Sequence, residues 1–326
     1  MEDMTMKKFL KQFRGQTVSI YIALVAVVIL FSALSPTFFT ASNIIIVLRQ
    51  VSSLGIMALG MMYVMLLGNV DLSVGCEVSL LGIVMSYCMV NMGMSIPVTI
   101  LICIILGLLI GVINGFVVTY CKIPSIIATL GTSWIFKGIS YTICNAQPIY
   151  GFPEKFSTLG QGSIGPIPIP IILFVLCALL TSFILNKTTY GRTLYAVGSN
   201  EESARLSGIN TKFMQMTSYI ICSAFTILAS IILLSRVNSG QPSTGIGQEM
   251  NVLTSIVLGG ICFTGGDGQV SGSIAGVLVI GVLQNGLVML GAGEYVQLMV
   301  KGLILLFALS IDSIKSYIKS RQKTVV

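Results

Sequence analysis

The residues best suited to polar chemistry lie in a short interruption of an apolar stretch, GNVDLSVG, at residues 68–75. Asn69, Asp71 and Ser73 supply an amide, a carboxylate and a hydroxyl, which can satisfy backbone groups that leave a helix. The glycines at both ends permit backbone geometry that a helix interior resists. Ser73 or Asp71 is expected to cap the helix that follows. We therefore predict a broken or re-entrant segment here.

A second interruption covers residues 259–272 (GGICFTGGDGQVSG) and continues an apolar segment too short to cross a membrane comfortably. The two interruptions share a spacing: Leu59-Gly60, Gly68 and Ser73-x-Gly75 correspond to Leu258-Gly259, Gly265 and Ser271-Gly272. Paired interruptions of this kind indicate a transport site built from internal repeats. The alternative is a chance match, because glycine and leucine are frequent in this chain.

Enzymatic and metal chemistry are disfavoured by the residue types that the chain lacks. It has no histidine, and its eight cysteines fall mostly in apolar runs without a CxxC pair. We predict buried apolar cysteines, no catalytic residue, no metal site and no cofactor.

The composition requires the bilayer as solvent for most of the chain. Of 326 residues, 55% are hydrophobic and only 9% are charged, and the mean hydropathy is +0.95. A soluble domain usually carries about 25% charged residues. Soluble enzymes, nucleic-acid-binding modules and disordered linkers are therefore excluded, and the predicted fold class is an all-α polytopic membrane protein.

Apolar segments of suitable length predict about ten transmembrane helices and two broken or re-entrant segments. The predicted spans are residues 17–34, 43–67, 72–90, 97–120, 124–145, 166–185, 213–235, 252–264, 272–290 and 295–312. The predicted organisation is a tail at residues 1–16, one transmembrane permease domain at 17–312 with a polar loop at 186–212, and a tail at 313–326.

Basic residues predict the orientation of these spans. Thirteen of them fall on the predicted face that carries both termini and the 186–212 loop, and two, Lys155 and Arg236, fall on the other. The positive-inside rule therefore places both termini and this loop in the cytoplasm. Arg49, Lys137 and Lys301 lie in or near spans. Lys301 is expected to snorkel or to pair with Glu294, or else to pair with a carboxylate inside the bundle.

The 186–212 loop contains a short helix with a predicted capping box, formed by Ser199 and Glu202. Gly208 is well suited to the position just past its end. A helix of about two turns is not stable alone in water. It either lies on the bundle as a connector or couples the bundle to a partner. The chain has no phosphate-binding loop, so an ATPase would be a separate polypeptide.

Five segments together resemble the permease subunits of ribose/xylose-type sugar ABC importers. They are GNVDLSVG (68–75), IPSIIATLG (123–131), GRTLYAVGSNEESARLSGI (191–209), QPSTGIGQEMNVLTSIVLGG (241–260) and QNGLVMLGAGEYVQLMVK (284–301). The match is collinear over nearly the whole chain after the first span. The family usually has GGIDLSVG at the first segment, so Asn69 is a departure. Asn251 and Asp267 also depart from the usual residues, which weakens any transfer of a particular sugar.

The resemblance implies a complex in a bacterial plasma (inner) membrane. Its parts are two copies of the permease (a homodimer, or a heterodimer), two ATP-binding-cassette subunits that use the ATP, and an extracytoplasmic substrate-binding protein. The resemblance also places Glu249, Lys301 and Asp312 at positions that match the family. It places the first break, with Asp71, Ser73 and Gly75, near the translocation path. The segment that docks on the ATPase would comprise Gly198, Asn200, Glu201, Glu202, Ala204, Arg205, Leu206, Ser207 and Gly208.

The implied cargo is a small sugar, with a ribose-like pentose favoured. A neutral, hydroxyl-rich solute needs matched hydrogen bonds, so Asn69, Asn114, Gln284 and Asn285 are candidate path residues. Hydrogen bonds between helices are the alternative role of Asn114 and Gln284. Alternative cargoes are a nucleoside, a hexose or a furanose signal molecule. An ion-coupled secondary transporter would instead use Asp71 and Glu77 as ion sites.

Overall fold

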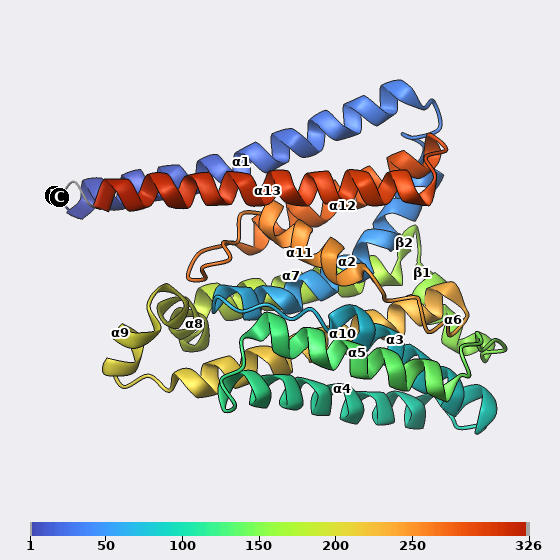
Figure 1. Cartoon of the computed structure of the whole chain (residues 1–326). Coiled ribbons are helices and arrows are strands. Elements are labelled where there is room, and N and C mark those ends of the chain that lie inside the picture. Colours follow the sequence, from blue (N-terminus) through green and yellow to red (C-terminus); the bar gives the residue numbers. More distant parts are fainter. Residues whose placement is uncertain (1, 324–326) are drawn as a thin grey trace.

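The chain is an all-α polytopic membrane protein (Figure 1). The computed structural model describes the backbone of residues 2–323 and the side chains of residues 18–307 and Ser310. Six described helices are long and apolar enough to cross a membrane, and Val18–Leu34 is a shorter apolar stretch. The six are Ala41–Leu66, Val74–Asn91, Ile96–Thr119, Ile169–Lys187, Thr211–Val237 and Val270–Met289.

The elements follow one another in a helical series with a single small hairpin among the described residues. They are α1 (Glu2–Leu34), α2 (Ala41–Leu66), α3 (Val74–Ser86), the π-helical turn η1 (Tyr87–Asn91), α4 (Ile96–Thr119), α5 (Ser125–Ile143), α6 (Glu154–Gln161), β1 (Ser163–Ile164), β2 (Ile167–Pro168), α7 (Ile169–Lys187), α8 (Thr189–Ser199), α9 (Glu201–Leu206), α10 (Thr211–Val237), α11 (Gln248–Leu258), α12 (Val270–Met289) and α13 (Glu294–Lys323).

Each of the ten predicted spans overlaps a helix, although the number that cross a membrane stays a prediction. The predicted short span at 252–264 is α11, which has only 11 residues. A helix of that length is about 16 Å long, roughly half the thickness of the hydrocarbon core.

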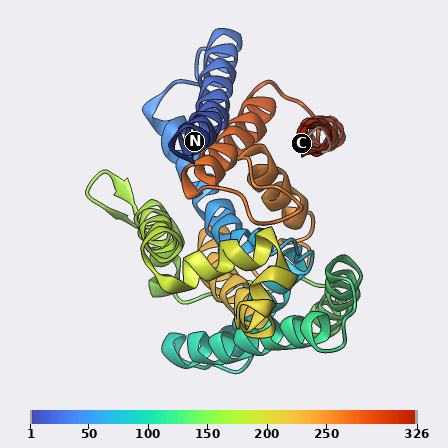
Figure 2. The ribbon, with the colours of Figure 1, turned by 90° about the vertical axis from the view of Figure 1, so that its left-hand side faces the viewer.

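The core of the bundle is built around α2 and α10. From Val51 to Leu66 every residue of α2 is buried, as expected of a helix that is apolar all round. By contrast, α4 and α7 expose most of their apolar surface, which suits contact with lipid. Figure 2 shows α4 and α5 along one side of the bundle and α1, α12 and α13 along the other.

The N-terminal ends of α3 and of the half-length helix α11 meet inside the bundle. Residues 240–245 run beside α3, since Gly240 lies against Ser86 and Gly245 lies against Gly75. The Gly245 N–H donates to Ser79 Oγ (3.0 Å). The chain then turns at Gly247, which has φ +86°, and α11 begins. The second segment to enter the bundle is therefore residues 238–247.

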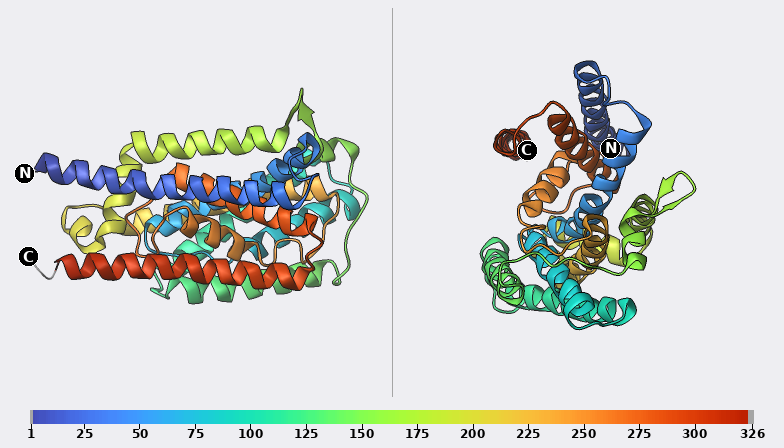
Figure 3. Two further views of the ribbon diagram at one scale, coloured as in Figure 1. Left: turned by 90° about the horizontal axis from the view of Figure 1, so that it is seen from above. Right: turned by 90° about the vertical axis from the view of Figure 1, so that its right-hand side faces the viewer.

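The predicted second break is present, since residues 259–269 are non-helical. They form the connection from α11 to α12 at the end of the bundle that carries α8. The N-terminal end of α1 and the C-terminal end of α13 lie at this same end (Figures 1 and 3). Such an arrangement is expected for an even number of crossings.

Candidate functional site

The first interruption forms a buried polar cluster between α3 and α4. Asp71 Oδ1 accepts hydrogen bonds from the backbone N–H of Ser73 (2.9 Å) and from its hydroxyl (2.6 Å). Asn114 Nδ2 donates to Ser73 Oγ (2.8 Å) and to Asp71 Oδ2 (3.4 Å). Asp71, Ser73 and Asn114 are fully buried. Ser73 is the N-cap residue of α3, as predicted, but it makes no side-chain capping bond because its hydroxyl donates to Asp71.

A second buried carboxylate, Glu77, lies in the first turn of α3. One oxygen, Oε2, accepts from Ser223 Oγ of α10 (3.2 Å). Glu77 Oε1 and Asn114 Oδ1 have no hydrogen-bond partner among the described residues. No group of three or more cysteine, aspartate or glutamate side chains there could hold a metal ion. The cluster can therefore bind α3, α4 and α10 together or hold a proton, and it is not built as a polydentate metal centre.

Another polar cluster joins α2 to α12. Asn43 and Asn285 exchange two amide hydrogen bonds, each 2.9 Å long, and Gln50 Nε2 donates to Gln284 Oε1 (3.4 Å). Asn69 belongs to neither cluster, and its backbone N–H donates to Val64 O (3.2 Å). The structure thus separates the candidate path residues into a group around Asp71 and a group around Asn285.

Helix α9 is the short helix that the polar loop predicts. Its N-cap is Asn200, whose Oδ1 accepts from the Ser203 N–H (2.8 Å). The predicted capping box is wrong, because Ser199 is the last residue of α8 and its hydroxyl donates back to Tyr195 O (2.8 Å). The predicted end is confirmed: Gly208 has φ +82° and its N–H donates to Arg205 O (3.0 Å).

One side of α9 is attached to the bundle and the other is free. Ala204 is buried, and Gln215 of α10 donates to Glu201 Oε1 (3.1 Å). Glu202 and Arg205 form an exposed ion pair (2.7 Å). Leu206 is 79% exposed. An exposed leucine beside an oriented charge pair is suited to contact with another protein.

Behind α9, three segments distant in sequence meet in what we call the glycine junction: Leu66–Gly68, Tyr195–Ser199 and Gly265–Gly268. The Gly266 N–H donates to Leu66 O (2.8 Å). A Cβ at Gly198 would overlap Leu66 O and lie 2.7 Å from Gly266 N. All three segments were visible as motifs in the sequence, but their convergence was not.

Two side chains of α8 hold the connection from α11 to α12 in the glycine junction. Tyr195 Oη donates to Gly268 O (2.8 Å), and Ser199 Oγ lies 3.4 Å from Gly266 O. Burial, and secondarily the nearby Asp267, raises the pKa of Tyr195 to about 12. The phenol therefore keeps its proton at physiological pH and remains a donor.

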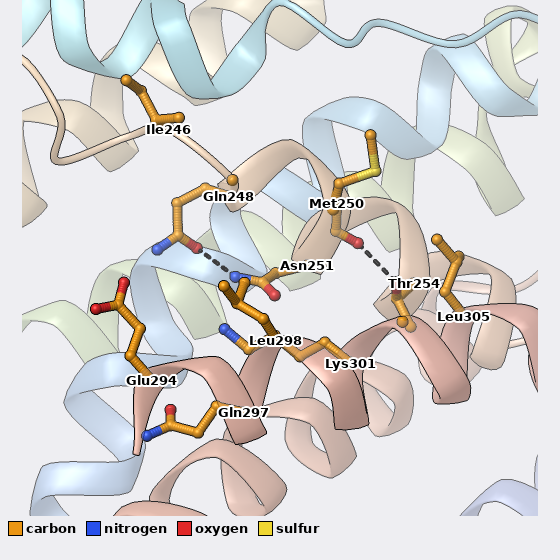
Figure 4. A pocket seen from close by; sticks show the side chains of 12 residues that line it. Ile246, Gln248, Met250, Asn251, Thr254, Glu294, Gln297, Leu298, Lys301 and Leu305 are labelled. Atoms are coloured by element: carbon orange, nitrogen blue, oxygen red, sulfur yellow. Dashed lines mark hydrogen bonds between the residues drawn. The ribbon is translucent and has the colours of Figure 1, made fainter.

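A groove of about 340 Å³ lies between α11 and α13 (Figure 4). We call this groove the α11–α13 groove. Its lining combines amides and charged groups with apolar side chains. The lining residues are Ile246, Gly247, Gln248, Met250, Asn251, Thr254, Glu294, Gln297, Leu298, Lys301, Gly302 and Leu305. Among the described residues, no carboxylate oxygen lies within 4.0 Å of Lys301 Nζ. Neither predicted ion pair of Lys301 is therefore formed.

Comparison with known proteins places the chain among transport permeases. The model of a family described as branched-chain amino acid transport system / permease component matches residues 43–309. The ribose import permease protein of Escherichia coli K12 is 36% identical over 298 residues, 90% of this chain and 92% of the relative. That of Bacillus subtilis 168 is 37% identical over 298 residues, with 91% and 92% covered. The L-arabinose transport system permease protein of E. coli K12 is 35% identical over 302 residues, 92% of each chain. No solved structure matches the chain.

Proposed function

Since the chain belongs to the family of branched-chain amino acid transport system permease components, we propose that it is the transmembrane subunit of an ATP-driven importer for a small sugar. Ribose is the preferred cargo, because ribose permeases of two distant bacteria are 36% and 37% identical over nine-tenths of the chain. An arabinose permease at 35% identity supports the wider class of pentoses.

Helix α9 is the observation that carries the coupling part of this proposal. It is a capped helix of six residues that presents Leu206, Glu202 and Arg205 outward. A helix so short gains its stability from what it packs against. We assign residues 198–208 as the segment that docks on the ATPase.

The glycine junction offers a route by which α9 can act on the bundle. A displacement of α8 must move Gly266 and Gly268, or open their hydrogen bonds to Leu66 and Tyr195. These residues adjoin the end of α2 and the start of α12. The ATPase can drive this change only through contacts that differ between its nucleotide states.

The complex that we propose has two permease copies, identical or different, two ATP-binding-cassette subunits and an extracytoplasmic binding protein. The end of the bundle with α8, α9 and both termini would face the cytoplasm of a bacterial cell. The bias of basic residues toward this end supports that orientation. Asn69, Asp71, Ser73, Gly75, Asn114, Gln284 and Asn285 would lie near the translocation path.

The test is ATP-dependent uptake of radiolabelled ribose by the permease reconstituted in proteoliposomes with the ATPase and binding protein encoded beside it. Arabinose, xylose, a nucleoside and leucine serve as competitors. We expect ribose or another pentose to be imported only with ATP. Import of leucine and of no sugar would show that the cargo is an amino acid. Uptake driven by a proton or sodium gradient without ATP would refute the ABC mechanism.

The docking assignment has its own variants. Glu202→Gln and Gly208→Val should lower sugar uptake and ATPase stimulation while membrane insertion is unchanged. Glu154→Gln, an exposed carboxylate at the start of α6, is the matched control and should transport normally. Normal uptake by both docking variants would contradict the assignment.

A further inference from the structure

We infer that the α11–α13 groove is a binding site for an uncharged, hydroxyl-rich solute during its passage through the permease. The inference rests on the proposed function and assigns the solute contacts that the proposed function leaves open.

Each wall of the groove carries polar side chains among apolar ones. Glu294, Gln297 and Lys301 are spaced by three and four residues, so they share one face of α13. Tyr295 and Met299 are 81% and 62% exposed on other faces of the same helix. Gln297 and Lys301 fall in the predicted span 295–312, and polar side chains within a transmembrane segment are costly and usually mark a functional site.

The hydrogen-bonding groups that remain free in the groove suit hydroxyls. Asn251 Nδ2 donates to Gln248 Oε1 (3.2 Å), and Gln297 Nε2 donates to Ala292 O (2.9 Å). Within the described residues these bonds leave Gln248 Nε2 as a donor and Asn251 Oδ1 and Gln297 Oε1 as acceptors. A sugar hydroxyl both donates and accepts, so it can use all three. Figure 4 shows Gln248 and Asn251 on one wall and Gln297 on the other.

The charges of the groove favour a neutral solute. Glu294 and Lys301 contribute one charge of each sign, so the lining carries no net charge to recruit an anion or a cation. A volume of about 340 Å³ lies at the small end of the range of about 300–1,000 Å³ for small-ligand pockets. The groove therefore has room for one small molecule at a time.

The position of the groove connects it to the first break. Ile246 and Gly247 line the groove, and the adjacent Gly245 lies against Gly75 at the start of α3. The groove thus begins where the first break and α11 meet inside the bundle, which is where transporters built from broken helices place their substrates.

Thiol labelling tests whether the groove holds water, independently of any sugar. In the complete importer, Asn251→Cys should react with a small, charged, membrane-impermeant thiol reagent, above the background of the eight native cysteines. Met299→Cys, on another face of α13, should not react above that background. If Asn251→Cys reacts neither with ATP bound to the importer nor without ATP, the inference is overturned.

Transport by variants tests whether the groove binds the solute. Asn251→Leu and Gln297→Leu should each lower the maximal rate of ribose uptake about fivefold, and the double variant by more than tenfold, while basal ATP hydrolysis is retained. Thr142→Val in α5 is the matched control, because its hydroxyl bonds a carbonyl of its own helix outside the groove; it should transport normally. Undiminished uptake by the amide variants would also overturn the inference. If the wild-type importer transports no pentose, the proposal of a pentose cargo is refuted. The thiol-labelling result decides independently whether the groove is open to water.

Discussion

The close packing of Gly198 permits a quantitative test of the glycine junction. In Gly198→Ala the new Cβ would overlap Leu66 O and approach Gly266 N to 2.7 Å. Since both atoms belong to the backbone, neither can rotate away as a flexible side chain would. Helix α8 must move outward, or the Gly266–Leu66 hydrogen bond must open.

The magnitude follows from these two alternatives. Overpacking of a close-packed interior costs about 1–3 kcal/mol, and the loss of one backbone hydrogen bond costs about 0.5–1.5 kcal/mol. We take about 2 kcal/mol as the expected destabilisation. With an unfolding entropy of about 2.1 cal/mol/K per residue, that corresponds in a chain of 326 residues to a melting temperature lower by about 3 °C.

The assay compares the melting temperature of the purified permease with ribose uptake per ATP hydrolysed in the reconstituted importer. Gly198→Ala should lower both, and uptake per ATP should fall about tenfold because the displaced α8 no longer holds Gly266. Gly138→Ala in α5 is the matched control, since a Cβ there meets no atom within 4 Å. If Gly198→Ala behaves like Gly138→Ala in both measurements, the junction neither packs nor transmits motion as described.

Three further predictions concern side-chain hydrogen bonds. Tyr195→Phe removes only the hydroxyl that donates to Gly268 O. Sugar uptake per ATP hydrolysed should fall about threefold, while the circular dichroism spectrum is unchanged. Unaltered uptake per ATP would refute the role of this hydrogen bond. Asn200→Ala removes the cap of α9 and should destabilise that helix by about 1 kcal/mol. Less ATPase should then co-purify with the permease. Asn200→Asp keeps a capping oxygen and should restore co-purification. Asn43→Leu and Asn285→Leu each remove both hydrogen bonds between the two amides. A double-mutant cycle on the free energy of unfolding should therefore show coupling of about 1.2 kcal/mol, twice the average of about 0.6 kcal/mol for one such bond in membranes; strictly additive effects would contradict the pairing.

The second re-entrant segment shows why part of the candidate site could not be predicted. Residues 238–247 contain a proline, three glycines and several polar residues, a composition typical of a surface loop. Their entry into the bundle depends on Gly75 and Gly245, which lack side chains and so let two backbones touch. That contact joins residues 170 positions apart, and no local pattern encodes it.

The start of α9 was mispredicted for a local reason. Ser199 and Asn200 are both good capping residues, and the S-x-x-E pattern favours the serine. In the structure α8 continues through Ser199, whose hydroxyl bonds back to Tyr195 O, so the cap passes to Asn200. Propensity could not choose between the two, because the choice depends on how far α8 is held against Gly266 and Gly268.

By itself, the sequence determined the helices, the first break and the short helix with its end at Gly208. These features follow from local physics: backbone groups in lipid must bond within their own helix, and a residue at φ +82° is best supplied by glycine. Only the tertiary structure decided that α3 and α11 meet, that α8 reaches both interruptions, and that Asn251 and Gln297 share a groove. Those contacts join chain segments far apart in sequence, and their geometry depends on which small residues let the backbones approach.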